Sequence, residues 1–408
     1  QKCQIISHAG KVTGKYKDFY NILKLNDNSI KDLNWKMVEQ WKSYSGQEDI
    51  FIVEKTKDED ILAAKVTEIN SWKENNVFEI MEYVGQLAIS SRWVITEKIV
   101  NGEKVIKARL VARGFEEDNS EILKDSPTCT KESMRLALTI FASNEWICNS
   151  IDIKSAFLQG KQIDRTVFLI PPPEFQEPNV IWKLNTCIYG LSDASRSWYL
   201  RVKEELCNLG VQCSRVEPSL FFWHFNNRLE GLLISHVDDF CWGGTDNFKN
   251  KVIDPLKTVF AIGTEFEKTF KYLGLNITQT KNFNINLDQI QFIDEINQIE
   301  ISRERTKNKS DKLTDDELKS YRTLIGQLSW AANRTRPDIS FSVCELSSAV
   351  KHATVEHLLK ANKVLKNVKD QQIVLTFPRM QNMQDCTFVT YSDSSKRGAE
   401  TYSLLKSL

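Results

Sequence analysis

Segments with helical spacing of apolar residues alternate along the chain with segments of strand spacing, a pattern that predicts a mixed α+β fold. In residues 1–60 neither period persists, so we expect a poorly structured leading segment or linker there. From residue 61 the spacing predicts a helix. Its apolar stripe consists of Leu62, Val66, Ile69 and Trp72.

Two pairs of turn residues predict β-hairpins. Asn101-Gly102 is a pair favoured in two-residue turns, and Asn226-Asn227 stands in a similar position between two extended runs. The second hairpin leads directly into Val237-Asp238-Asp239. The strand-like runs that flank the two turns are 86–100, 104–113, Ser219–His224 and Leu229–Val237.

Capping signals bound two amphipathic helices. Thr130 is a candidate N-cap for a helix that begins at Lys131, and Gly210 suits the left-handed C-cap of a helix over Ser192–Leu209. Their apolar stripes are Met134, Ala137, Leu138 and Phe141, then Trp198, Val202, Leu206 and Leu209. The remaining pattern predicts a helix at 247–260, a strand at 270–278, a charged break at 302–317, a helical stretch at 314–368 and strands at 373–377 and 387–392.

Composition limits the classes of protein that fit. The chain has 408 residues with 41% hydrophobic and 26% charged side chains, enough to form the cores of two to four domains. Because 54 Lys and Arg balance 54 Asp and Glu, any nucleic-acid partner needs a local basic surface. The nine cysteines are odd in number and include no C-x-x-C pair, which favours free thiols in a reducing compartment. With no apolar run long enough to span a membrane, we expect a soluble intracellular protein.

The candidate chemistry lies in three carboxylates at predicted strand ends. Asp238 and Asp239 follow the apolar run GLLISHV, and Asp152 ends the short strand in ICNSIDIKSAFLQG. Adjacent carboxylates repel one another, and a divalent cation is the usual remedy. Ligation by oxygen alone favours Mg²⁺ or Mn²⁺ over Zn²⁺. Taken by itself, this pattern of acids is better explained by a solvated turn.

Six blocks occur in one order along the chain and together carry a family resemblance. The sequence resembles the reverse transcriptase of copia-type LTR retrotransposons over about residues 61 to 395. The blocks are KARLVARGFEE at 107–117, SIDIKSAFLQG at 150–160, WKLNTCIYGLSDASRSWY at 182–199, VDDF at 237–240, YLGLNI at 272–277 and LIGQLSWAANRTRPDI at 324–339.

This resemblance implies a right-hand polymerase with fingers, palm and thumb, followed by a connection region and a truncated RNase H-like end. The implied limits are a leading segment at 1–60, fingers and palm at 61–245, a thumb-like region at 246–312, a helical connection at 313–385 and the start of an RNase H-like domain at 386–408. The implied activity is RNA-directed DNA synthesis from dNTPs on an RNA template with a DNA or RNA primer. A cytoplasmic virus-like particle is the implied location.

The resemblance also implies roles for residues of the palm. Asp152, Asp238 and Asp239 match the catalytic acids and would hold two Mg²⁺ ions, with Mn²⁺ as a substitute. The backbone carbonyl of Ile153 would be a further ligand. Phe157 matches the aromatic residue that lies under the incoming sugar and rejects a 2′-hydroxyl, although its position is also that of an ordinary core phenylalanine.

Residues for phosphate and nucleic-acid contact are implied elsewhere. Positions 92–113 carry six positive charges against two negative ones, a local excess suited to phosphates or to a solvated strand face. We select Lys107 and Arg109 for the nucleotide, with Arg113 in reserve for nucleic acid. The block Tyr272-Leu273-Gly274 matches the segment that holds the primer end, and a plain β-turn explains it nearly as well. Arg336-Pro337-Asp338 is taken as a family marker only.

Three departures from the family pattern bear on activity. His236 stands where the family usually has Tyr, and Asp193 stands where it usually has Gln facing the incoming nucleotide. Asp393 in TYSDSS matches the first metal-binding acid of an RNase H fold, but the later acids of that fold are absent, so we expect no cleavage of RNA. The chain starts with Gln1, which indicates a piece of a longer polyprotein or a truncated reading frame.

Three interpretations follow. The leading one is a reverse transcriptase that performs two-metal nucleotidyl transfer. The alternative is a decayed or domesticated retroelement fragment that binds nucleic acid or protein without polymerising. The third is a remnant that does not fold stably.

Overall fold

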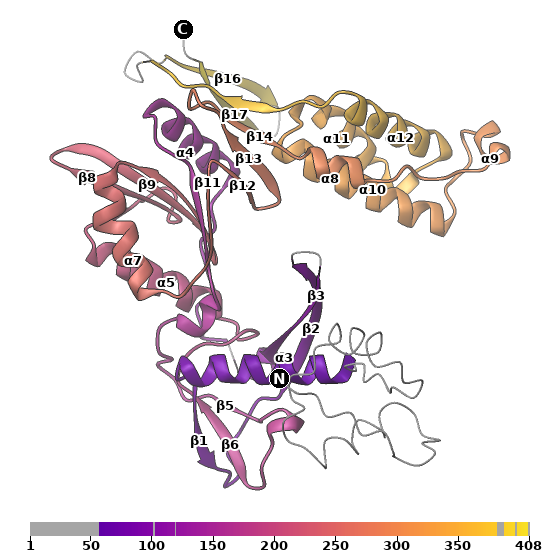
Figure 1. Ribbon diagram of the computed structural model, residues 1–408. Helices are drawn as coiled ribbons and strands as arrows, with labels where there is room; N and C mark the ends of the chain where they lie inside the picture. Colours follow the sequence, from indigo (N-terminus) through magenta and orange to yellow (C-terminus); the bar gives the residue numbers. More distant parts are fainter. Residues whose placement is uncertain (1–56, 101–102, 119, 382–386, 396–397, 407–408) are drawn as a thin grey trace, which may run out of the picture. The chain divides into compact units, whose positions relative to one another are not determined.

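Helices and strands both occur throughout the computed structural model, so the α+β prediction is confirmed (Figure 1). The chain forms two units: residues up to Ser120 with Ile163–Ser192 make unit 1, and Glu121–Gln162 with the rest of the chain from Asp193 make unit 2. The prediction for residues 1–60 lies outside the described residues except for the last four, which begin a helix. The structure describes residues 57–100, 103–118, 120–381, 387–395 and 398–406.

Unit 1 combines one long helix, a small sheet and a hairpin. The three-stranded sheet has the order β1-β6-β5, and the hairpin pairs β2 with β3 from Ser91↔Ala112 to Val100↔Glu103. The predicted hairpin is therefore confirmed, although Asn101 and Gly102 themselves lie outside the described residues. The elements are α3 (Lys57–Glu74), β1 (Phe78–Glu82), β2 (Ser91–Val100), β3 (Glu103–Ala112), η2 (Gly114–Glu116), β5 (Phe168–Leu169), η4 (Pro173–Phe175) and β6 (Val180–Leu184).

The predicted apolar stripe of α3 is partly wrong. Ile69 and Trp72 are buried, whereas Leu62 and Val66 are 49% and 41% exposed. The inward face instead includes Glu68, which accepts hydrogen bonds from Trp72 Nε1 at 3.2 Å and from the backbone N–H of Leu110 at 3.4 Å. The spacing of apolar residues alone therefore does not identify the buried face of α3, because this face includes a hydrogen-bonded carboxylate.

Unit 2 is built on a six-stranded sheet of order β11-β4-β10-β9-β8-β7. Asn226 and Asn227 have φ of +49° and +59° and form the two-residue turn between β8 and β9, as predicted. The strands are β4 (Asn149–Ile153), β7 (Gln212–Cys213), β8 (Leu220–Phe225), β9 (Arg228–His236), β10 (Asp239–Gly244) and β11 (Ile262–Glu267). Strand β11, which pairs directly with β4, was not predicted.

Both faces of this sheet are covered, because successive residues of β10 enter different cores. Phe240 and Trp242 pack with Trp198 of α5, while Cys241 packs with Phe141 of α4. A Cβ at Gly243 would lie 2.6 Å from the Phe141 ring, so glycine is what allows α4 to pack so closely. The helices are α4 (Lys131–Ser143), η3 (Ala156–Gln159), α5 (Ala194–Asn208), α6 (Asp246–Phe248), η5 (Lys249–Ile253) and α7 (Asp254–Val259).

The cap predictions for α4 and α5 are confirmed. Thr130 accepts a hydrogen bond from the Ser133 N–H at 3.2 Å, and the four predicted apolar residues of α4 are buried. Gly210 has φ +79° after the end of α5. Helical capping and apolar spacing were therefore sufficient to locate both helices.

The later part of unit 2 contains a second sheet of order β12-β13-β14-β15 and a helical bundle (Figure 1). The predicted strand at 270–278 is in fact a hairpin, and the helical stretch at 314–368 is three α-helices joined by two short 3-10 helices. A two-stranded hairpin of β16 and β17 follows. The elements are β12 (Thr269–Tyr272), β13 (Leu275–Gln279), β14 (Ile285–Asp288), α8 (Ile290–Glu295), α9 (Arg303–Lys307), α10 (Asp315–Arg334), η6 (Pro337–Ile339), α11 (Ser340–Ser348), η7 (Val350–His352), α12 (Val355–Asp370), β15 (Leu375–Phe377), β16 (Thr387–Ser395) and β17 (Gly398–Lys406).

Arg336 explains why the block at 334–338 is structural. Its side chain is 1% exposed, makes two hydrogen bonds to the Asp338 carboxylate at 2.9 and 2.8 Å, and donates to the Val368 carbonyl at 2.8 Å. These bonds join η6 to the end of α12. None of the helices in the described part of the chain is both long and apolar enough to cross a membrane.

Candidate active site

Two of the three predicted acids lie opposite each other on neighbouring strands. Asp152 on β4 pairs with Asp239 on β10, and Asp239 in turn pairs with His236 on β9. Directly opposed residues point to the same face of a sheet, with Cβ atoms about 5 Å apart. The sheet therefore gathers two carboxylates and an imidazole at one end of its central strands.

Asp238 occupies the two-residue turn between β9 and β10. The preceding Val237 has φ +58°, a conformation that is unfavourable for a β-branched residue and costs about 1–3 kcal/mol. Two hydrogen bonds hold this turn: the Ile153 N–H donates to the Asp238 carbonyl at 3.0 Å, and Trp198 Nε1 donates to the Val237 carbonyl at 2.7 Å. The strained turn is thus anchored by β4 on one side and α5 on the other.

The electrostatics of Asp239 reflect this crowding. Burial, then the charge of Asp238, then the charge of Asp152 raise the pKa of Asp239 to about 6 from an ordinary 3.8. For His236, burial and the positive charge of Arg334 lower the pKa, and Asp238 opposes them. Its Nδ1 atom is buried without a hydrogen-bond partner among the described residues. A cation near the acids would offset the repulsion that raises the Asp239 pKa.

The three acids suit a metal ion through the chemistry of their donor atoms. Carboxylate oxygens from three neighbouring acids are ligands that Mg²⁺ and Mn²⁺ accept. Within the described ranges, however, no three His, Cys, Asp or Glu side chains form a group that could hold a metal ion. The fold brings the acids to one end of the sheet.

Phe157 and Asp193 both lie in unit 2. Phe157 is in η3, directly after β4, and its half-buried ring packs against the core that contains Trp198. Asp193 occupies the N-cap position of α5, and its carbonyl accepts the Ser197 N–H at 2.8 Å. Their predicted contacts with a nucleotide stay predictions.

The block Tyr272-Leu273-Gly274 is the turn of the β12–β13 hairpin, where Leu273 has φ +51° and Gly274 φ +75°. The Tyr272 ring is 1% exposed, and burial raises the pKa of its hydroxyl well above the usual value. The ring is therefore a core group, and the surface of this block consists of Leu273 and Gly274. Asp393 lies on β16 in register with Glu400.

The candidate phosphate-binding residues lie in unit 1. Lys107 and Arg109 are exposed on β3 and alternate with the buried Ala108 and Leu110. The Arg109 guanidinium lies 5.1 Å from the centre of the Tyr189 ring, within range of a cation–π contact. Arg113 follows β3 and pairs with Glu116 at 3.8 Å. Lys107 and Arg109 therefore share one exposed face of the strand, and their predicted contact with phosphate stays a prediction.

The segment Tyr189-Gly190-Leu191, within the block at 182–199, holds the β2–β3 hairpin through close backbone contact. The Ala112 N–H donates to the Tyr189 carbonyl at 2.7 Å, and a Cβ at Gly190 would lie 2.1 Å from the Ala112 carbonyl oxygen. Gly190 also has φ +95°, which favours glycine. The block therefore serves unit 1 as a backbone connector beside β3.

Sequence reasoning missed two features of the site. Trp198 was predicted only as a core residue, yet its indole N–H holds the turn that carries Asp238. The strand β11, which lies beside Asp152, was not predicted at all. The signal available was the alternation in AIGTEFE, which glycine and charged residues obscure.

The carboxylates of Asp152 on β4, Asp239 on β10 and Asp238 in the β9–β10 turn are oxygen donors of the kind that hold divalent ions in phosphoryl-transfer sites. A model of the family described as reverse transcriptase (RNA-dependent DNA polymerase) matches residues 75–310. The chain belongs to this family, and the resemblance to copia-type elements is confirmed. Reverse transcriptases depend on divalent metal ions.

Similar proteins include retrotransposon polyproteins. The retrovirus-related Pol polyprotein from transposon RE1 of Arabidopsis thaliana is 28% identical over 339 residues, covering 77% of this chain and 22% of that protein. The corresponding protein from transposon TNT 1-94 of Nicotiana tabacum is 23% identical over 337 residues, covering 76% and 25%. This chain thus spans about a quarter or less of the length of these relatives. Among solved structures, the foamy viral protease-reverse transcriptase dRH in complex with double-stranded DNA has a TM-score of 0.47 at 12% identity, covering 84% of this chain and 53% of that one.

Proposed function

We propose that this chain is the RNA-directed DNA polymerase part of a retrotransposon Pol polyprotein. It adds nucleotides from dNTPs to the 3′-hydroxyl of a primer on an RNA template. The observation that carries this proposal is the direct pairing of Asp152 with Asp239, with Asp238 held in the anchored turn beside them. An arrangement of three acids supports catalysis over the alternative of a fragment that only binds.

Asp152, Asp238, Asp239 and the Ile153 carbonyl are the groups that would hold two Mg²⁺ ions, with Mn²⁺ as a substitute. When bound, the ions supply activation of the primer hydroxyl and stabilisation of the charge that develops on the pyrophosphate. The contribution of the chain is to fix the acids: the two hydrogen bonds to the turn keep Asp238 beside β4.

Lys107 and Arg109 bind the triphosphate in this proposal, because they are exposed cations on one face of a hairpin. Stacking on Tyr189 limits the orientations of the Arg109 guanidinium. Phe157 contacts the sugar of the incoming nucleotide, and Asp193 faces that nucleotide. Arg113, Leu273 and Gly274 contact nucleic acid. The fingers, palm, thumb and connection limits, the RNase H role of Asp393 and the location in a cytoplasmic particle are parts of the same proposal and rest on the resemblance.

The test is extension of a labelled DNA primer on an RNA template with four dNTPs. We expect extension with Mg²⁺ or Mn²⁺ and none with excess chelator. Binding of the primer–template without extension under any divalent ion would favour the binding-only fragment. Stoichiometric zinc that is needed for extension would contradict the proposed ligand set.

A further inference from the structure

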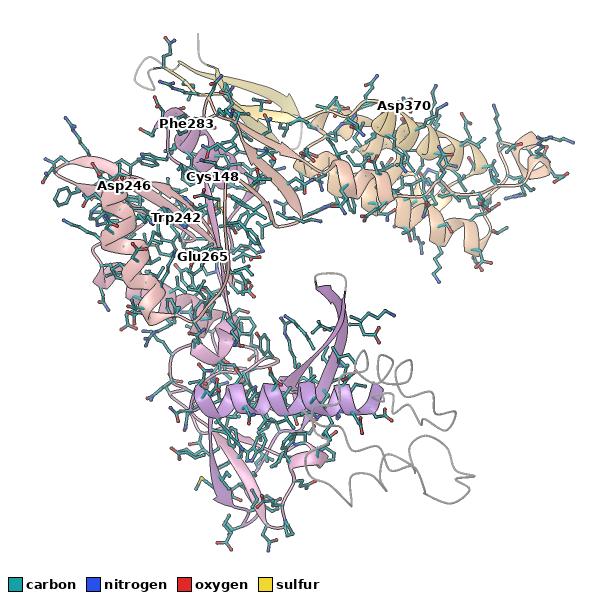
Figure 2. All side chains as sticks on the ribbon, in the orientation of Figure 1. Cys148, Trp242, Asp246, Glu265, Phe283 and Asp370 are labelled. Atoms are coloured by element: carbon teal, nitrogen blue, oxygen red, sulfur yellow. The ribbon has the colours of Figure 1, made fainter. Side chains whose placement is uncertain are left out.

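A β-bulge lies beside the candidate acid Asp152. Strand β11 pairs with β4 through Ile262↔Ile153 and Glu265↔Ile151, and the register shifts between these pairs. Two residues, Gly263 and Thr264, therefore oppose Asp152 alone. Bulges are frequent next to active sites, where they change the direction of a side chain. In Figure 2 the labelled Glu265 marks β11 at the end of this bulge.

The carboxylate of Asp152 occupies the space that a side chain at position 263 would need. A Cβ built on Gly263 would lie 2.2 Å from Asp152 Oδ2, 3.3 Å from its Cγ and 3.3 Å from its backbone oxygen. Cβ atoms essentially never approach another heavy atom within 3.0 Å, and ordinary contact begins at 3.4 Å. Restoring that contact would move Oδ2 by roughly 1 Å, the difference between 3.4 and 2.2 Å.

The backbone at Gly263 gives no other reason for glycine. Its φ lies outside the positive range in which glycine is favoured. Other residues could therefore adopt this conformation, and the need for a missing Cβ comes mainly from the neighbouring carboxylate, with a smaller part from the Asp152 backbone oxygen.

The start of β11 is tied to the chain that follows Asp152, which limits its freedom to move away. The Lys154 N–H donates to the Ala261 carbonyl at 2.9 Å, and the Ala261 N–H donates to the Gln159 side-chain oxygen at 2.9 Å. Gln159 also donates to the Lys154 carbonyl at 2.6 Å. With these bonds in place, an added methyl group displaces the Asp152 side chain rather than the strand.

From this geometry we infer that Gly263 is a positioning residue for Asp152. By leaving its Cβ space open within the bulge, it sets the direction of the carboxylate and so its use as a metal ligand. The functional part of this inference rests on the polymerase function proposed above, whereas the contact itself does not.

The first experiment compares Gly263→Ala with the matched control Thr264→Ala, which changes the other residue of the same bulge without filling the space. A displacement of about 1 Å in a catalytic group can lower a rate by up to about a hundredfold. We expect Gly263→Ala to lower kcat between about 10- and 100-fold and to raise the Mg²⁺ concentration needed for half-maximal extension. The Kd for primer–template should stay unchanged. A kcat within about twofold of the wild type would overturn the positioning role.

The second experiment does not require enzymatic activity. It is a double-mutant cycle of Gly263→Ala and Asp152→Ala, in which the midpoint of urea unfolding is measured for each variant. We expect Gly263→Ala to lower the midpoint in the wild-type background. In the Asp152→Ala background, where Oδ2 is gone, the shift should fall to about half or less. Equal shifts in both backgrounds would show that the carboxylate does not occupy the Gly263 space. If Gly263→Ala alone fails to fold, the same cycle predicts that the double variant folds.

The two experiments separate the inference from the proposed function. A wild-type chain that binds primer–template but never extends it refutes the polymerase function, and the cycle then decides the contact alone. A wild-type chain that extends, beside a Gly263→Ala variant that extends equally well, refutes the positioning role and leaves the polymerase function intact.

Discussion

Replacing Asp239 by asparagine should make the protein more stable while it removes one of the proposed catalytic acids. Burial and two neighbouring carboxylates raise the pKa of Asp239 from 3.8 to about 6. In the folded chain the proton is therefore held more tightly than in the unfolded chain. Stability falls as the pH rises from about 4 through about 6, and above that range the full cost of ionisation is present.

The size of the effect follows from the same pKa change. A rise from 3.8 to about 6 corresponds to at most about 3 kcal/mol. Because the side chain is only half-buried, solvent screening reduces this to about 1 kcal/mol. Asp239→Asn should therefore gain about 1 kcal/mol at pH 8 and much less at pH 4.

Urea unfolding in the presence of a chelator, followed by far-UV circular dichroism at pH 4 and pH 8, measures this difference. The matched control is Asp294→Asn, which removes an exposed carboxylate from α8. We expect the control to shift the midpoint little at either pH. An Asp239→Asn protein that is equally or less stable than the wild type at pH 8 would refute the claim that the acids are crowded.

Three further predictions concern packing and phosphate contact. Gly190→Ala should cost unit 1 at least about 2 kcal/mol, because φ is +95° and the new Cβ would meet the Ala112 carbonyl oxygen at 2.1 Å. The control is Gly326→Ala, whose new Cβ meets nothing within 4 Å. Thermal unfolding of both variants should show the loss for Gly190→Ala and a small gain in helix stability for Gly326→Ala. Arg336→Ala should cost the helical bundle about 3 kcal/mol in a urea titration, because it leaves the Val368 carbonyl and the Asp338 carboxylate without their buried donor. Arg109→Ala should raise the KM for dNTP in steady-state extension more than it lowers kcat, and an unchanged KM would remove Arg109 from the triphosphate site.

Local signals located the elements that carry the acids. The turn pair Asn226-Asn227 and the apolar run before Asp238 were enough to predict the hairpin β8–β9 and the position of Asp238 at its end. Capping chemistry located α4 through Thr130. In these segments the residues that decide the structure are neighbours in sequence, so a pattern reveals them.

Longer-range features could not be predicted in the same way. The pairing of Asp152 with Asp239 joins residues from strands far apart in the chain, and only the resemblance placed them together. Glu68 was counted as polar, yet its bonds to Trp72 and Leu110 bring it to the inner face of α3. The run at 270–278 was predicted as one strand, but it contains a turn. Leucine rarely adopts a positive φ, so the conformation of Leu273 could not be predicted from its residue type. The first two misses depend at least partly on partners that are distant in sequence, and the third depends on a local backbone conformation that the residue type does not favour.

The most direct test of the central claim is primer extension on an RNA template by Asp238→Asn beside the wild type. The matched control is Asp246→Asn, which removes a carboxylate at the start of α6, just beyond the far end of β10. We expect wild type and control to extend the primer with Mg²⁺. The Asp238→Asn protein should bind primer–template normally and lose extension on the order of a thousandfold, since it lacks a proposed metal ligand. Extension by Asp238→Asn at the wild-type rate would contradict the assignment of this turn as the catalytic centre.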